Sequence, residues 1–203
     1  MRKIISMTFV TMDGVMQAPG GPEEDTSNEF KHGGWQAHVM DNSLGEILNE
    51  LLTPPFAMLL GHTTYNIFAG FWPKQGPENA IAQAFNDATK YVVSHQPFAP
   101  DWVNTKVVSG DVPSALRKLK AEEGPDLVVW GSGNLIQTLL RAQLIDRMHV
   151  WTHPVTIGAG KRLFADGTRA GTWKVVKSRV GNAGVIVGTY EPAGTLVTGT
   201  MDA

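Results

Sequence analysis

Hydrophobic positions along the first two thirds of the chain follow two alternating periods. Continuous short runs of apolar and β-branched residues are typical of buried strands, and they predict strands at residues 4–10, 56–60, 90–94, 105–109 and 126–130. Leucine and isoleucine three or four positions apart are typical of amphipathic helices. With the neighbouring caps, prolines and glycines, they predict helices at residues 41–52, 78–89, 111–124 and 134–141, and another helix capped by Thr63 or Thr64.

The pattern changes after Asp146, where no further helix period is present. Strand-like segments at residues 147–158, 171–178 and 183–192 follow one another directly. Strands that alternate with helices predict a parallel sheet, and strands without helices between them predict antiparallel neighbours. The sequence therefore predicts one α/β domain over residues 1–192, with a mixed, mostly parallel sheet, antiparallel C-terminal strands and a tail at residues 193–203.

A polar segment rich in glycine and proline, QAPGGPEEDTSNEFKHGG at residues 17–34, interrupts the predicted elements. Its composition predicts a long surface loop. Loops of this length within a domain are usually substrate covers, binding loops or disordered insertions. We interpret this one as a candidate substrate cover, with a flexible insertion as the alternative.

Composition limits the classes of function. The 203 residues are 42% hydrophobic and 18% charged, with a formal net charge of -2 and no cysteine. This balance gives no electrostatic reason to expect nucleic acid or an anionic membrane as a partner, and it leaves no disulfide or thiolate metal site. Because no apolar run approaches the ~18 residues of a membrane span, and the N-terminus does not have the pattern of a signal peptide, we expect a soluble cytoplasmic protein.

No metal site or nucleoside-triphosphate loop is predicted. His149 and His153 belong to a strand-like segment, in which residues four apart are separated by roughly 13 Å. The segment IGAGKRLF has glycines followed by lysine, but the glycine of a phosphate loop is replaced by Val155 and its Ser or Thr by Arg162.

Candidate binding chemistry begins with the stretch VVWGSGNLIQTLL at residues 128–140, in which a strand, a glycine turn and a helix follow one another. Free amide groups at the start of the helix suit a phosphate or pyrophosphate, and Gly131 and Gly133 let the backbone approach it closely. The third glycine of the dinucleotide fingerprint is replaced by Ile136, so a standard Rossmann domain is disfavoured. A tight turn without a ligand is the alternative.

Two other predicted turns have a similar character. In LLGHTTYN a strand ends at Gly61 and is followed by His62, Thr63 and Thr64, whereas VVSHQP places Ser94, His95 and Gln96 after the next strand. Ligands of open α/β sheets gather outside the carboxyl ends of parallel strands. If these strands are parallel, the three turns face one elongated ligand.

The same segments, together with MTFVTMDGVMQAPGGPEEDTSNEFKHGGW and HPVTIGAGKRLF, resemble the dihydrofolate-reductase-like family that includes the C-terminal reductase domain of the bifunctional riboflavin-biosynthesis deaminase/reductase. The resemblance covers roughly residues 2–191. It implies a three-layer dihydrofolate-reductase-like fold, NADPH as the hydride donor and a homodimer.

The resemblance also implies roles for particular residues. The segments Gly61–Thr64 and Ser94–Gln96 would hold the adenosine-side phosphates, and the pyrophosphate would lie against Gly131, Ser132, Gly133, Asn134, Leu135 and Ile136. The first strand and the turn that contains Gly14 would flank the nicotinamide and the substrate, with Trp35 as a second substrate-binding position. Many relatives have arginine at the positions of His62 and His95. Since histidine is only partly cationic near neutrality, the preference for NADPH over NADH depends on these two positions.

The proton source of the reaction has three candidates, which are Asp13, Asp41 and water. The alternative interpretation of Asp13 is a turn-forming Asp-Gly pair, and that of Asp41 is an ordinary helix N-cap. The sequence leads to the hypothesis of an NADPH-dependent reductase that transfers hydride to a C=O or C=N carbon of a small polar substrate resembling a pyrimidine, a pterin or a riboflavin precursor. The alternatives are a true dihydrofolate reductase, a non-catalytic dinucleotide-binding module and a structural or interaction protein.

Overall fold

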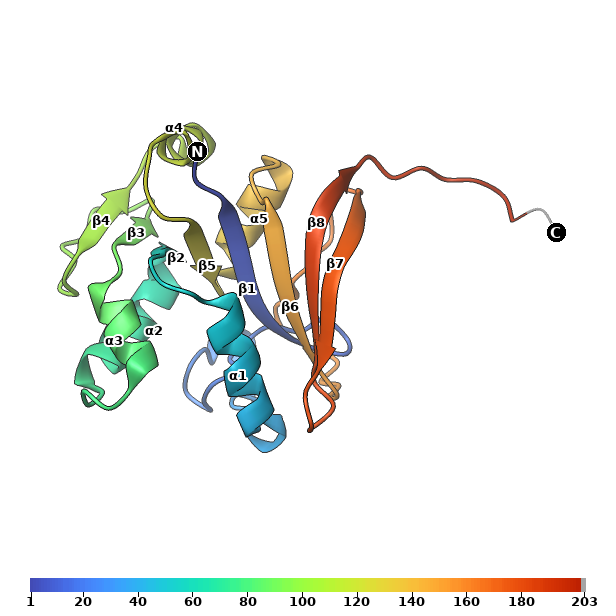
Figure 1. The fold of residues 1–203 in the computed structure, drawn as a ribbon, viewed down its shortest axis with the longest axis horizontal. Helices are drawn as coiled ribbons and strands as arrows, with labels where there is room; N and C mark the ends of the chain where they lie inside the picture. Colours follow the sequence, from blue (N-terminus) through green and yellow to red (C-terminus); the bar gives the residue numbers. More distant parts are fainter. Residues whose placement is uncertain (202–203) are drawn as a thin grey trace.

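An eight-stranded mixed sheet runs through the computed structural model, which describes residues 1–201 (Figure 1). The strand order is β4-β3-β2-β5-β1-β6-β8-β7. Every pair from β4 to β6 is parallel, whereas β8 is antiparallel to both β6 and β7. The strands are β1 Ile4–Thr11, β2 Ala57–Gly61, β3 Lys90–Val93, β4 Thr105–Val108, β5 Leu127–Trp130, β6 Arg147–His153, β7 Thr172–Val180 and β8 Ile186–Gly194. The predicted mixed sheet with antiparallel C-terminal strands is confirmed.

Helices cover both faces of the sheet and complete three layers. The α-helices are α1 Asn42–Leu51, α2 His62–Phe71, α3 Ala80–Asp87, α4 Val112–Ala121 and α5 Gly133–Arg141. The buried side chains of α4 and α5 pack in one apolar cluster, and those of α1, α2 and α3 pack in a second cluster on the opposite face. All residues of β5 are buried, which explains why its sequence is a continuous apolar run.

Several predicted boundaries differ from those in the structure. The predicted strand at residues 147–158 ends at His153, because Pro154 begins a turn that leads away from the sheet. The helix that Thr63 or Thr64 was expected to cap begins earlier, with Gly61 as its N-cap. β8 reaches Gly194, and residues 195–201 extend away from the body of the domain (Figure 1).

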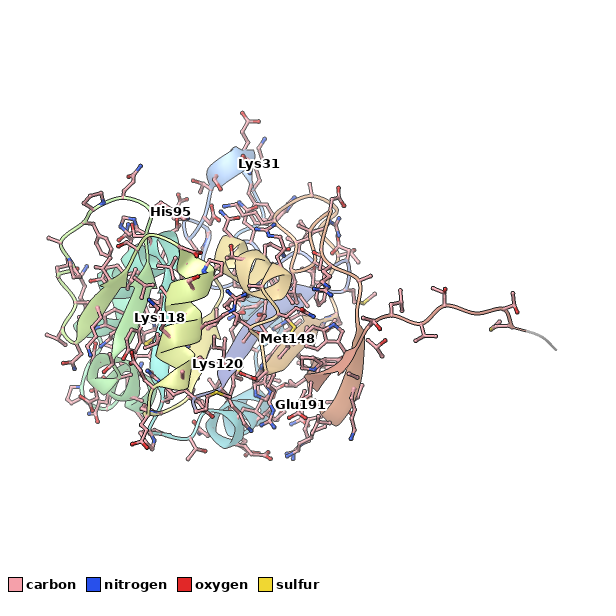
Figure 2. All side chains as sticks on the ribbon, turned by 90° about the horizontal axis from the view of Figure 1, so that it is seen from above. Lys31, His95, Lys118, Lys120, Met148 and Glu191 are labelled. Carbon is pink, nitrogen blue, oxygen red and sulfur yellow. The ribbon has the colours of Figure 1, made fainter. Side chains whose placement is uncertain are left out.

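Ion pairs and amide contacts fix the amino ends of the parallel strands. The Lys120 ammonium, labelled on α4 in Figure 2, lies 2.6 Å from the Asp146 carboxylate. The same carboxylate accepts a hydrogen bond of 2.8 Å from the Ile4 amide at the start of β1. This contact joins α4, β1 and the turn before β6 at the edge opposite to the glycine turns.

A buried lysine lies at the amino end of β3. The Lys90 ammonium donates to the backbone oxygens of Asn86 (2.6 Å) and Val103 (3.2 Å) and lies 4.3 Å from the centre of the Trp102 ring. Burial disfavours the charged form and lowers the pKa of Lys90 to about 8.

Lys90 should make the free energy of unfolding depend on pH in the alkaline range. Because its folded pKa lies below the unfolded value of about 10.4, the unfolded chain binds more protons between these values, and stability should rise with pH there. In Lys90→Met this rise should be smaller, as measured by urea unfolding at several pH values between 7.5 and 10.5. The exposed Lys118→Met is the control, and equal slopes in the two variants would contradict the prediction.

Candidate functional site

The carboxyl ends of neighbouring parallel strands bring the three predicted turns to one edge of the sheet. β2 lies between β3 and β5, and each strand pairs with its neighbour in parallel register. Gly61 at the end of β2 is paired with Val93, the residue before Ser94. The turns that begin at Gly61, Ser94 and Gly131 are therefore neighbours, although they come from distant parts of the chain.

The turn after β5 has an unusual backbone conformation. Gly131 has a φ of 51°, and Ser132 has φ 57° and ψ 55°, so both residues are left-handed before α5 begins at Gly133. A left-handed residue followed by a right-handed one directs successive amide groups into one concavity, which binds anions. The first amides of a helix add a positive dipole end. This turn has the chemistry of a phosphate-binding site.

The hydroxyl of Ser132 connects this turn to the turn after β2. It accepts a hydrogen bond of 2.9 Å from the Gly61 amide. A Cβ atom on Gly131 would lie 3.9 Å from the Thr64 side chain, so the start of α2 also packs against the start of α5. Two helix N-termini therefore converge on one region.

The turn after β3 lies beside the start of α2. The Ser94 hydroxyl donates to the Gln96 carbonyl oxygen (2.6 Å) and lies 3.4 Å from Nδ1 of His62. The His62 ring stacks on Phe98 with 4.2 Å between the ring centres. Phe98 is a neighbour that the sequence analysis missed, and the available signal was an aromatic residue directly after the SHQP turn. His95, labelled in Figure 2, is exposed.

Other predicted cofactor-binding residues lie in α5. Leu135 and Ile136 are buried in the apolar cluster below the helix. The Ile136 amide donates to the Ser132 carbonyl oxygen (3.0 Å) and is used by the helix itself. Gly133 and Asn134 form the first turn, where amides are free of intrahelical bonds. The Gly131 amide donates to the Met7 carbonyl oxygen (3.4 Å), so the amides of Ser132–Asn134 are the ones left to face a ligand.

Asp13 holds the turn after β1 to the segment after β6. Its carboxylate accepts hydrogen bonds from the Thr11 hydroxyl (2.6 Å) and from the amides of Gly158 (2.7 Å) and Ile157 (3.2 Å). The Thr11 hydroxyl, followed by the Gly158 amide, lowers the pKa of Asp13 to about 2. An ionised carboxylate with these partners stabilises the turn. The adjacent Gly14 has a φ of 82° and is placed in the same turn.

Asp41 is the N-cap of α1, as its alternative interpretation predicted. Its carboxylate accepts from the amides of Ser43 and Ala183, both at 2.7 Å, so it joins α1 to the turn between β7 and β8. The hydrogen bond from the Ser43 hydroxyl lowers the pKa of the Asp41 carboxyl. Both candidate proton donors thus have structural partners, and their catalytic roles stay predictions.

The loop predicted at residues 17–34 lies at the surface, as expected, and is anchored by buried residues at a few points. Phe30 and Trp35 form a small apolar cluster with Val15 and Ala18. The indole N–H of Trp35 donates to the Gln17 carbonyl oxygen (2.8 Å). The predicted substrate-binding residue Trp35 is therefore buried under the loop, next to the end of β1.

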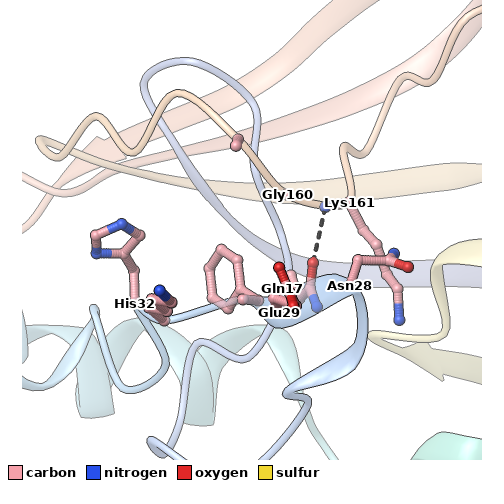
Figure 3. A pocket seen from close by; sticks show the side chains of 9 residues that line it. Gln17, Asn28, Glu29, His32, Gly160 and Lys161 are labelled. Atoms are coloured by element: carbon pink, nitrogen blue, oxygen red, sulfur yellow. Dashed lines mark hydrogen bonds between the residues drawn. The ribbon is translucent and has the colours of Figure 1, made fainter.

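Polar contacts fasten this loop to the segment after β6. The Gln17 side chain is buried, and its oxygen accepts from the Lys161 amide (3.1 Å), as Figure 3 shows. The Lys161 ammonium bonds to the Asp25 carboxylate (2.6 Å) and the Ser27 hydroxyl (2.7 Å). A pocket of about 390 Å³ lies between the loop and residues 159–161. We name the Gln17, Asp25, Ser27 and Lys161 contacts the loop latch.

Within residues 1–201, no group of three or more His, Cys, Asp or Glu side chains could hold a metal ion. Over the same residues, no helix has both the length and the apolar character required to cross a bilayer.

The fold is that of dihydrofolate-reductase-like proteins. Dihydrofolate reductase from Enterococcus faecalis, complexed with NADP(H), superposes with a TM-score of 0.58 at 16% identity and covers 94% of this chain and 96% of its own. A protein of Shewanella sp. PV-4 named for riboflavin biosynthesis gives a TM-score of 0.65 at 18% identity, covering 95% and 99% of the two chains. A pyrimidine reductase-like protein of Corynebacterium diphtheriae gives 0.61 at 13% identity, covering 94% and 92%.

Sequence comparison assigns the family within this fold. Residues 2–187 match the RibD C-terminal domain, and the chain belongs to that family. The uncharacterized protein YyaP of Bacillus subtilis is 27% identical over 195 residues, which cover 93% of this chain and 94% of YyaP. The resemblance to riboflavin-pathway reductase domains is thus confirmed, and the chain belongs to a reductase family.

The loop latch should control the mobility of residues 17–36. In Lys161→Met the ion pair with Asp25 is lost, so amide hydrogen exchange in this segment should become at least about tenfold faster, while exchange in β1 and β5 stays unchanged. Lys31→Met, on the same loop, is the matched control and should leave exchange as in the wild type. Equal protection in both variants would show that the apolar cluster alone holds the loop.

Proposed function

We propose that this protein is an NADPH-dependent reductase that transfers hydride to a C=O or C=N carbon of a small polar substrate. The observation that carries the proposal is the convergence of the α2 and α5 N-termini, joined by the hydrogen bond between Ser132 and Gly61. Membership of the RibD C-terminal domain family supports it. The NADP(H) complex of the Enterococcus faecalis enzyme, which has the same fold, supports the choice of cofactor.

The residues at the strand ends fit a nicotinamide dinucleotide. The amides of Ser132, Gly133 and Asn134 would bind its pyrophosphate, since left-handed turns and helix N-termini favour anions. The His62–Thr64 turn and the Ser94–Gln96 turn would bind the adenosine-side phosphate. When bound, NADPH supplies the hydride at nicotinamide C4. The protein's contribution would be to hold donor and acceptor carbons close together and to exclude water.

The substrate would lie at the end of β1, where Trp35, near the end of the loop at residues 17–36, is buried. A pyrimidine, pterin or riboflavin-precursor ring is the substrate class, in keeping with the names of the structural neighbours. We propose water as the proton source. The lowered pKa values of Asp13 and Asp41 leave both carboxyl groups ionised at neutral pH.

Binding of the dinucleotide is tested by thermal shift with NADPH, NADH, FAD and ATP. NADPH at about 100 times its Kd should stabilise the protein by about 2.7 kcal/mol. Gly131→Ala places a methyl group where the backbone would approach the pyrophosphate and should weaken NADPH binding at least about tenfold. Gly167→Ala is the matched control, because Gly167 also has a positive φ (80°) and a Cβ there would meet nothing within 4 Å.

The outcomes separate the alternative functions. NADPH binding without turnover of any carbonyl, pyrimidine or folate substrate would favour the non-catalytic module. Failure to bind any dinucleotide would favour a structural or interaction protein. Reduction of dihydrofolate at a higher kcat/KM than any pyrimidine or carbonyl substrate would identify a true dihydrofolate reductase.

Cofactor preference is expected to depend on His62. Arginine is always charged and binds phosphate through two parallel hydrogen bonds, so His62→Arg should raise the affinity for NADPH relative to NADH by about tenfold or more. Titrations of the wild type and His62→Arg with both cofactors measure this change, with His38→Arg as the control. Parallel changes for the two cofactors would be evidence against a phosphate contact at His62.

The proposal includes a homodimer in the cytoplasm. Val175, Val180 and Ile186 on the β7–β8 hairpin are 56%, 68% and 49% exposed, and exposed apolar surface of this kind is typical of an interface. Sedimentation velocity gives the oligomeric state, and a monomer at micromolar concentration would contradict this part of the proposal.

A further inference from the structure

A histidine nitrogen without a partner lies under the loop. His153, the last residue of β6, is 0% exposed. Its Nδ1 lies 3.0 Å from the Trp151 carbonyl oxygen and 3.3 Å from that of Val10. Carbonyl oxygens only accept hydrogen bonds, so Nδ1 carries the ring proton and Nε2 is a bare acceptor. Within residues 1–201, Nε2 has no hydrogen-bond partner.

Two aromatic side chains flank His153. The ring meets Trp35 of the loop at 5.2 Å and Phe9 of β1 at 6.0 Å between centres, both edge to face. Nδ1 faces the backbone of β1 and β6, and Nε2 belongs to the same fully buried ring.

A buried acceptor without a donor is uncommon and has a free-energy cost. By contrast, the ring of His149 on the same strand has a hydrogen-bond partner, because its Nδ1 lies 2.9 Å from the Thr189 hydroxyl. The side-chain oxygen of Gln36, next to Trp35, is a second buried acceptor that has no donor within residues 1–201. Within residues 1–201, both Trp35's sequence neighbour Gln36 and its ring contact His153 thus have a buried acceptor without a donor.

We propose that Nε2 of His153 accepts a hydrogen bond from a ligand that enters when the loop at residues 17–36 lifts. The ligand is a flat aromatic ring that carries an N–H or amino donor. The flat ring matches the Phe9 and Trp35 side chains, and the donor matches the unpartnered nitrogen. This inference deepens the proposed function, because the ligand would be the hydride acceptor.

Opening of the loop requires the loop latch to break. Trp35 covers the His153 ring while its indole N–H is held by the Gln17 carbonyl oxygen. Gln17 and Lys161 in turn hold the loop to the segment after β6. Loss of the Lys161 ion pair should lower the cost of opening and favour ligand entry.

A matched pair of probes tests the hydrogen bond directly. 2-Aminopyrimidine carries a donor, and 2-methylpyrimidine has nearly the same shape without one. Wild-type protein should bind the amino probe about threefold to tenfold more tightly in calorimetric or NMR titrations, the ratio that one net hydrogen bond gives. His153→Phe should remove this preference, while the control His149→Phe should retain it. Lys161→Met should bind the amino probe more tightly than the wild type.

Three outcomes would overturn the inference: equal binding of the two probes by the wild type, binding of neither at millimolar concentration, or an unchanged preference in His153→Phe. If His153→Phe does not fold, His153→Gln and ¹⁵N spectra of histidine-labelled wild type decide the question. The His153 Nε2 resonance should move with the amino probe and stay in place with the methyl probe.

Thermal shift with NADPH on the same samples distinguishes the two proposals. NADPH should still stabilise His153→Phe, because the turns proposed to bind its phosphates contain other residues. If the protein distinguishes the two probes but NADPH causes no thermal shift, the His153 site is supported and the proposed function is contradicted. If NADPH causes a thermal shift but the two probes bind equally, the proposed function is supported and the His153 site is contradicted.

Discussion

The hydrogen bond from the Gly61 amide to the Ser132 hydroxyl is the contact on which the candidate site depends. It joins two strand-to-helix turns that are separated by 71 residues in sequence. Ser132 adopts a left-handed conformation that is unfavourable for a residue with a side chain, and the hydrogen bond offsets part of this cost. Because β2 and β5 are parallel neighbours, both helices begin at the same edge of the sheet. The shared hydroxyl fixes their distance, and their free amides then face one region.

The other half of the site is organised by contacts between the start of the chain and the segment after β6. Asp13 binds the amides of residues 157 and 158, while the loop latch ties Gln17 and Asp25 to Lys161. These groups hold the loop over the end of β1 and leave His153 beneath it. The acidic residues that first suggested proton transfer are hydrogen-bonded to backbone amides. A charge in such a position stabilises a turn, and this explains why a carboxylate beside a glycine is poor evidence for catalysis.

The fold and the family membership limit different features of this protein. The sheet and its helices are shared with solved structures at 13% to 18% identity, because the apolar pattern that builds the layers tolerates extensive substitution. The glycine turns require particular backbone conformations, so their sequences can be recognised as those of the family. Side chains around the turns are freer to vary, and this chain has His62 stacked on Phe98. Differences in cofactor and substrate preference are expected at such positions.

The sequence by itself determined the elements and the local chemistry of the turns. Apolar runs indicated the parallel strands, leucine spacing indicated the helices, and Asp41 was recognisable as a helix N-cap because capping depends on residues two or three positions away. Tertiary structure alone decided that the loop rich in glycine and acids is held to the segment after β6, because Lys161, the partner of Gln17, lies 144 residues away in the sequence. It also decided that His153 lies bare beneath Trp35. Local propensity carries no information about such contacts, since they arise only after the strand order has brought β1 beside β6.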